Sequence, residues 1–198
     1  MSRFDPLVIA AKDHGAQDAI IISAKDGIVV EQRVNLLCRF GCGEYGKHLT
    51  CPPHAPHAED FVADYEHALL MTFLCPASIT LEKSHCLMSL TQGGNDPEVQ
   101  KFWKEWYSWK RVLYEQLLEL ERTAFALGLP FSLAFGVGCC PWCERCTDSY
   151  ADCRFPSRRR CSMEAVGINV VATCAKAGIA LKFPVAGHPT VAAMLLLE

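Results

Sequence analysis

Runs of apolar residues divide this chain into the strands and helices that it is expected to form. Two apolar, β-branched runs at 19–23 and 27–34 are separated by a turn signal, Lys-Asp-Gly, at 25–27. The pattern predicts a β-hairpin whose second strand leads directly into Cys38. A third run at 68–74 is apolar throughout, which favours a buried strand, although so short a run leaves a helix open.

The clearest helical pattern follows Asp96, a good N-cap residue, and Pro97, which suits a first turn. Gly128 and Pro130 end the pattern. Apolar residues recur inside it at three- and four-residue steps: Phe102, Trp106, Trp109, Leu113, Leu117 and Leu120. The tryptophan stripe that begins at Trp103 could form a flavin-binding or base-stacking surface, but its register with the leucines favours packing in the core.

Shorter segments complete the expected fold. Residues 57–66 look helical, 130–136 predict a strand, and 191–197 predict a last strand. Ser162 can cap a short helix, and 168–177 continue in a helical pattern. This order of elements favours an α/β fold with a mixed β-sheet packed with helices.

Two cysteine-rich segments interrupt the pattern, at 38–53 and at 139–161, and each is expected to follow a strand. No linker, repeat or low-complexity tract divides the chain. We therefore expect a single domain over residues 1–198.

The composition limits what these cysteines do. The chain has 12 cysteines among 198 residues, so a disulfide scaffold must be weighed. Disulfide-rich secreted domains are usually short, whereas this chain is 51% hydrophobic and long enough to bury a core without cross-links. No apolar signal region begins the chain, and no stretch reaches the ~18 apolar residues of a membrane span. We expect a cytoplasmic protein in a reducing environment, and the formal net charge of −3 argues against a dedicated nucleic-acid binder.

The downstream segment carries the strongest motif. Cys140, Cys143 and Cys146 form a C-x2-C-x2-C run, as in bacterial ferredoxins, where it binds three corners of an iron–sulfur cubane. Cys153 is the nearest candidate for the fourth ligand. In two-cluster ferredoxins, however, the fourth cysteine of the run binds the other cluster, so the partner of Cys153 stays open.

The upstream segment carries a second, less specific motif made of Cys38, Cys42 and Cys51. Glycines flank the middle cysteine and two prolines follow the last one, so the backbone is shaped to fold closely around a ligand. The spacing is uncommon for a zinc finger, although zinc remains an alternative to iron–sulfur.

Together these motifs resemble an uncharacterised family of predicted metal-binding proteins, and the resemblance spans nearly the whole chain. It rests on the segments Cys38-x3-Cys42-x2-Tyr45-Gly46-Lys47, Cys51-Pro52-Pro53, Cys140-x2-Cys143-x2-Cys146, Cys153-Arg-Phe-Pro156 and Ser162-Met-Glu-Ala165. The resemblance implies a cysteine-bound metal centre of iron–sulfur type in cytosolic proteins of anaerobes, and it supplies no reaction. Cys139 and Cys161 depart from the family pattern, which counts against both as ligands.

Two [4Fe–4S] clusters would normally require eight cysteines, and the motif cysteines number seven. Either one cluster keeps an iron without a cysteine, open to substrate, or an eighth ligand comes from the remaining cysteines: Cys75, Cys86, Cys161 or Cys174. Cys75 and Cys174 lie in apolar surroundings and are expected in the core. A single cluster with one structural site is a further possibility. Nearby His48, His54 and His57 could supply a nitrogen ligand, but surface positions are favoured because no histidine pair has ligand spacing.

The remaining candidates lie beside the two motifs. Arg154 and the run 158–160 form a basic cluster, expected as a solvated loop or as a docking site for an acidic partner or anionic substrate. Tyr45 and Lys47 could donate a proton or bind substrate. The chain carries no Ser-His-Asp arrangement, P-loop or dinucleotide fingerprint.

Three functions follow from these motifs. The preferred one is a [4Fe–4S] redox protein that transfers electrons to a partner protein or reduces a small molecule in anaerobic metabolism. The others are a zinc-stabilised binding protein and a factor that carries metal or clusters.

Overall fold

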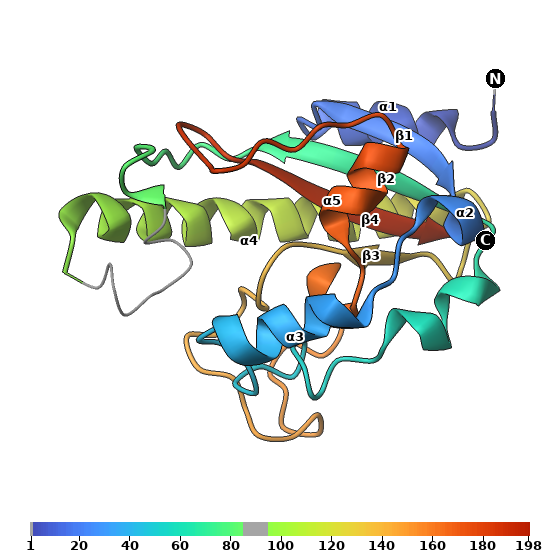
Figure 1. The fold of residues 1–198 in the computed structure, drawn as a ribbon. Helices are drawn as coiled ribbons and strands as arrows, with labels where there is room; N and C mark the ends of the chain where they lie inside the picture. The colour runs from blue at the N-terminus through green and yellow to red at the C-terminus, as the bar shows by residue number, and fades with distance from the viewer. Residues whose placement is uncertain (1, 85–94) are drawn as a thin grey trace.

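A four-stranded antiparallel sheet forms the centre of the computed structural model, which describes residues 2–84 and 95–198 (Figure 1). The strand order is β1-β2-β4-β3. The strands are β1 Asp18–Ser23, β2 His67–Leu74, β3 Leu133–Phe135 and β4 Thr190–Leu197. The α/β class is confirmed, as are the strands predicted at 68–74 and 191–197, and all three strand pairs are antiparallel.

Both faces of the sheet are covered, which explains why β2 and β4 are apolar throughout. Side chains alternate along β2, so that Leu69 and Leu70 enter different core clusters. Helices α1 (Asp5–Asp13) and α4 (Pro97–Ala126) cover one face. The other face packs against α2 (Ala24–Gly27), α5 (Val170–Lys176) and the short 3₁₀ helices η2 (Val62–Asp64) and η4 (Glu164–Val166).

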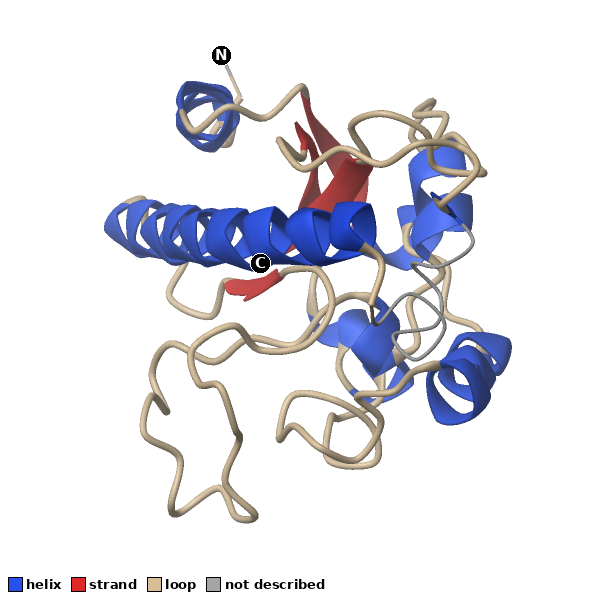
Figure 2. Ribbon diagram, turned by 90° about the vertical axis from the view of Figure 1, so that its left-hand side faces the viewer, coloured by secondary structure: helices blue, strands red, loops and turns tan. Residues whose placement is uncertain are grey.

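The long helix α4 begins where the sequence predicts. The Asp96 carboxylate accepts hydrogen bonds from the backbone N–H groups of Glu98 and Val99. The buried stripe of α4 includes Leu113, Leu117 and Leu120. In Figures 1 and 2 the cysteine-bearing loops lie together on one side of α4, beneath the sheet.

The predicted β-hairpin is wrong, because residues 27–34 form no strand. The Ser23 hydroxyl accepts a hydrogen bond from the Asp26 N–H, and the chain turns into α2. The following residues pack against the segment before α5, where Val30 makes an isolated bridge to Ile168. Strand β1 pairs with β2 instead. The first cysteine segment therefore follows no strand, and Cys38 lies in helix α3 (Gln32–Gly41).

Other segments differ in detail from the prediction. Residues 57–66 form two 3₁₀ helices, η1 (Ala58–Asp60) and η2. The Ser162 hydroxyl accepts a hydrogen bond from the Ala165 N–H, as a cap should, and the helix that follows is the single 3₁₀ turn η4. The helix α1 was not expected from the sequence. Among residues 2–84 and 95–198, no helix has the length and apolar character needed to cross a bilayer.

Candidate metal centre

Four cysteines of the downstream motif meet at one small cavity. Cys140, Cys143, Cys146 and Cys153 all line it, and its volume is about 20 Å³. His48, from the upstream segment, lines the same cavity. The fold therefore places Cys153 with the three cysteines of its own run.

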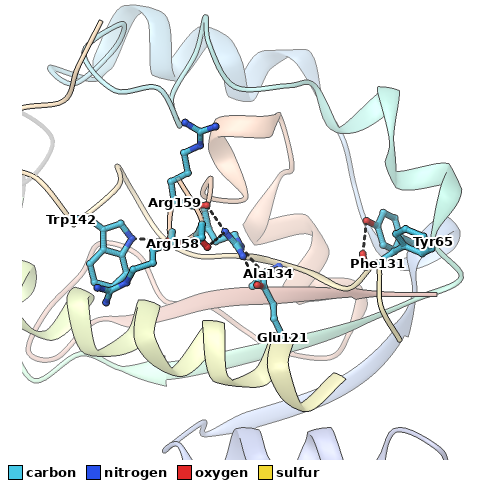
Figure 3. Close-up of polar contacts among 9 residues, drawn as sticks. Tyr65, Glu121, Phe131, Ala134, Trp142, Arg158 and Arg159 are labelled. Atoms are coloured by element: carbon cyan, nitrogen blue, oxygen red, sulfur yellow. Dashed lines mark hydrogen bonds and ion pairs between the residues drawn. The ribbon is translucent and has the colours of Figure 1, made fainter. Parts of the chain in front are cut away.

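The downstream loop is fixed to α4 at several points. Arg111 donates from Nε to the carbonyl of Pro141 at 2.9 Å. The Trp142 indole N–H donates to the carbonyl of Arg158 at 2.7 Å, and the Arg158 guanidinium lies 3.9 Å from the centre of the Trp142 ring (Figure 3). Arg158 also pairs with Glu115 of α4. These contacts hold the loop that carries the cysteines.

A second attachment lies near the end of the loop. Glu121 of α4 accepts a hydrogen bond from the Ala134 N–H of β3 at 2.7 Å (Figure 3). It also accepts one from Arg160 Nε at 2.6 Å. The side chains of both charged residues are largely buried, with 13% of Glu121 and 17% of Arg160 exposed. The basic cluster is thus anchored to the long helix at Arg158 and Arg160. Arg154 instead lines the downstream cavity.

The chain enters this loop through a glycine that permits very close packing. A Cβ atom on Gly136 would lie 2.6 Å from the ring of Tyr114, which is fully buried in α4. Gly136 directly follows β3. The second cysteine segment therefore does follow a strand, and the glycine brings it against α4.

The three upstream cysteines line a separate and much larger cavity of about 650 Å³. Cys38 and Cys42 lie one turn apart at the end of α3, and Cys51 follows in a turn in which its N–H donates to the carbonyl of His48. Tyr45 lines this cavity as well. The upstream motif is therefore also brought together by the fold.

Helix α4 also lines the larger cavity, through Trp103, Trp106, Tyr107 and Lys110. The tryptophans pack against apolar core residues, as predicted from their register. Two of them, Trp103 and Trp106, also line the cavity that the upstream cysteines line, which their spacing alone could not show.

Burial keeps several of these thiols protonated when no metal is bound. Desolvation raises the pKa of Cys38 and of Cys140 to about 11. Burial also raises the pKa of Cys51, and the charge of Cys139 contributes more to this shift than any other neighbouring charge. Such thiols become thiolates when a cation binds them, so the chemistry of both sets fits a metal centre.

Cys139 is a fourth cysteine that lines the larger cavity. The sequence had counted against it as a ligand. The residue is 8% exposed, and Lys110 Nζ lies 3.6 Å from its sulfur and 2.8 Å from its carbonyl oxygen. Burial raises the pKa of Cys139, but hydrogen bonding to His48 and the charge of Lys110 outweigh burial and lower it overall. No spacing rule pointed to Cys139, because its neighbours come from α3, α4 and the upstream loop.

His48 lines the smaller cavity and lies near Cys139, which lines the larger one. Its Nε2 lies 2.8 Å from a Glu44 carboxylate oxygen, and ligand atoms of Glu44, His48 and Cys139 all lie within 4.8 Å of one another. The sequence favoured a surface position for this residue, and that is wrong, because His48 is buried. By contrast His54 is exposed, and His57 lies near Glu59 at 3.7 Å.

The other cysteines that the structure describes line neither cavity. The structure places Cys75 and Cys174 in apolar clusters, as expected, and Cys161 lines neither cavity. Cys86 lies outside the described residues. The eleven cysteines in the described part of the chain are all free thiols.

Comparison with known proteins gives the chain a family. Residues 21–197 match the family described as predicted metal-binding protein (DUF2284). The match covers nearly the whole chain, and the protein belongs to this family. No curated protein and no solved structure matches it.

Proposed function

We propose that this chain binds [4Fe–4S] clusters at its two cysteine sets and acts as a redox protein. The observation that carries the proposal is the gathering of all seven motif cysteines around two cavities, four at the smaller and three at the larger. Thiolate sulfur is the usual protein ligand of iron in such clusters. The membership in a metal-binding family supports a metal centre of some kind.

The spacing of the sulfurs favours a cluster over a single zinc ion. Four sulfurs bound to one tetrahedral zinc at ~2.3 Å lie about 3.8 Å from one another. In the described residues, the three-residue group whose ligand atoms all lie within 4.8 Å of one another is Glu44, His48 and Cys139, which contains one cysteine. Thiols spread around a wider space suit ligands that bind separate corners of a cubane.

The upstream and downstream cysteine sets lie in different surroundings. An iron–sulfur cluster supplies one-electron transfer when bound. The larger cavity, at about 650 Å³, has the size of a small-molecule site, with an aromatic wall and the buried cation of Lys110. The smaller cavity lies close to it, since Cys139 lines the larger cavity and Cys140 the smaller one. We infer that a small-molecule substrate is reduced at the upstream set, and that the downstream set passes electrons to it.

The test is the visible absorption of protein purified without oxygen, recorded before and after dithionite. Broad absorption that bleaches on reduction supports the proposal. The Cys143→Ser variant should lose part of this absorption, since one ligand of the downstream set is removed. Colourless protein that does not respond to dithionite would overturn the redox function.

One observation favours zinc as a second candidate. The Glu44, His48 and Cys139 group offers three ligand atoms close enough for one ion. In that case the protein would be a zinc-stabilised binding protein. It would hold zinc without sulfide, and His48→Ala would release the zinc while Cys143→Ser would not.

A further inference from the structure

The larger cavity holds one more cysteine than the motif supplies. Cys38, Cys42 and Cys51 leave a cubane one thiolate short, and Cys139 lines the same cavity. We propose that Cys139 is the fourth thiolate ligand of the upstream centre. This inference rests on the proposed function, and it assigns a ligand that the family pattern does not include.

The adjacent positions of Cys139 and Cys140 in the chain support this assignment. Cys139 lines the larger cavity, and the next residue, Cys140, lines the smaller one. Two neighbouring cysteines thus line different cavities. One short segment after β3 therefore supplies a ligand to each centre, and a single peptide unit joins the two.

The charge around Cys139 supports the same conclusion. Lys110 is 1% exposed, and in the described residues no carboxylate oxygen lies within 4.0 Å of its ammonium group. Its contacts are the Cys139 carbonyl oxygen at 2.8 Å, the Cys139 sulfur at 3.6 Å and the Tyr107 ring at 4.5 Å. A buried cation needs an anionic partner, and metal-bound thiolates supply that negative charge.

The surroundings of the sulfur also suit a ligand. Lys110 Nζ lies 3.6 Å from the Cys139 sulfur, and a ring nitrogen of His48 lies within 4.8 Å of it. Such donors orient a sulfur ligand and stabilise its negative charge. Glu44 in turn holds His48 in place at 2.8 Å.

The competing cysteines are less well placed. Cys75 and Cys174 are packed in apolar clusters, and Cys161 does not line the larger cavity. Cys161 is the most demanding control, because the next residue, Ser162, lines the larger cavity.

The experiment compares full-length variants, each reconstituted with iron and sulfide without oxygen and assayed for iron, zinc and sulfide per chain. Cys42→Ser, in the motif, is the positive control, and Cys161→Ser and Cys174→Ser are the negative controls. We expect Cys139→Ser to lose about half of the iron, as Cys42→Ser does, while both negative controls keep the wild-type amount. Full iron content in Cys139→Ser, or equal loss in Cys161→Ser, would overturn the assignment.

A second measurement does not depend on a variant that folds. An anomalous difference map of wild-type crystals, at the absorption edge of the bound metal, should place a metal ion about 2.3 Å from the Cys139 sulfur. A metal bound by the upstream cysteines but more than ~3 Å from that sulfur would contradict the inference. Wild-type protein that binds only zinc would refute the iron–sulfur function, and the same map would still decide whether Cys139 is a ligand.

Discussion

Replacing Glu121 by glutamine tests whether the long helix holds the downstream cysteine loop in place. Glu121 binds both the Ala134 N–H of β3 and the guanidinium of Arg160, at the end of the loop. Glutamine keeps the size of the side chain and one oxygen acceptor. It removes the negative charge and turns an amide N–H donor toward Arg160.

The expected loss of stability follows from the burial of the pair. Breaking a fully buried ion pair costs ~3–5 kcal/mol, because the remaining charge is left without a partner. The Arg160 side chain is 17% exposed, and in the variant it keeps its hydrogen bonds to the carbonyls of Ser157 at 3.2 Å and Arg159 at 2.7 Å. Both facts lower the cost of breaking this ion pair. We expect Glu121→Gln to lower the free energy of unfolding by about 2 kcal/mol, or the Tm by roughly 4–8 °C.

The assay is urea or thermal unfolding of the metal-free protein, followed by metal analysis of the loaded protein. Glu119→Gln is the matched control, since Glu119 pairs with Arg122 on the same helix but both side chains are more than half exposed. That control should cost less than ~1 kcal/mol. The reasoning would be refuted if the two variants were equally stable. Glu121→Gln should also bind metal less tightly at the downstream cysteines than wild type does.

The remaining predictions concern the loop entry, the buried cation and the ligand sets. Gly136→Ala should lower stability by about 1–3 kcal/mol in thermal unfolding, because its Cβ would lie 2.6 Å from the Tyr114 ring. Lys110→Met should keep the metal content but lower the midpoint potential of the upstream centre in a redox titration, because the positive charge beside it is lost. Cys143→Ala should abolish the downstream centre and Cys174→Ala should leave metal content intact, as measured by elemental analysis.

Each of these predictions has a control or a contradicting outcome. Gly41→Ala meets no atom within 4 Å, so it should not be destabilising, and an equal loss in both glycine variants would contradict the packing argument. An unchanged potential in Lys110→Met would show that its charge does not act on the upstream centre. Iron loss in Cys174→Ala without loss in Cys143→Ala would show that the ligand grouping is wrong.

Features set by local sequence were predicted well. Helix α4 has a capping aspartate, a proline at its start and a long amphipathic stripe, and each of these signals acts within a few residues. Strands β2 and β4 are buried on both faces, so a continuous apolar run identified them. The hairpin prediction failed because a distant segment, before α5, competes with β1 for the residues after Gly27.

Only part of the candidate site was predicted, because some of its residues come from segments that are far apart in the sequence. The spacing of Cys140, Cys143 and Cys146 is local, and the structure does bring these cysteines together. Cys139 has no spacing signal toward Cys38 or the rest of the upstream set, because they meet only after α3 and the loop after β3 pack beside α4. Contacts of this kind depend on the whole fold.

The central claim concerns what the two cysteine sets bind, and metal analysis tests it most directly. Iron, zinc and acid-labile sulfide should be measured per chain on protein purified without oxygen. We predict iron and sulfide in near-equal amounts, at about eight of each when both sets are loaded. Zinc without sulfide would contradict the account, because the chain would then be a structural zinc protein with no redox centre.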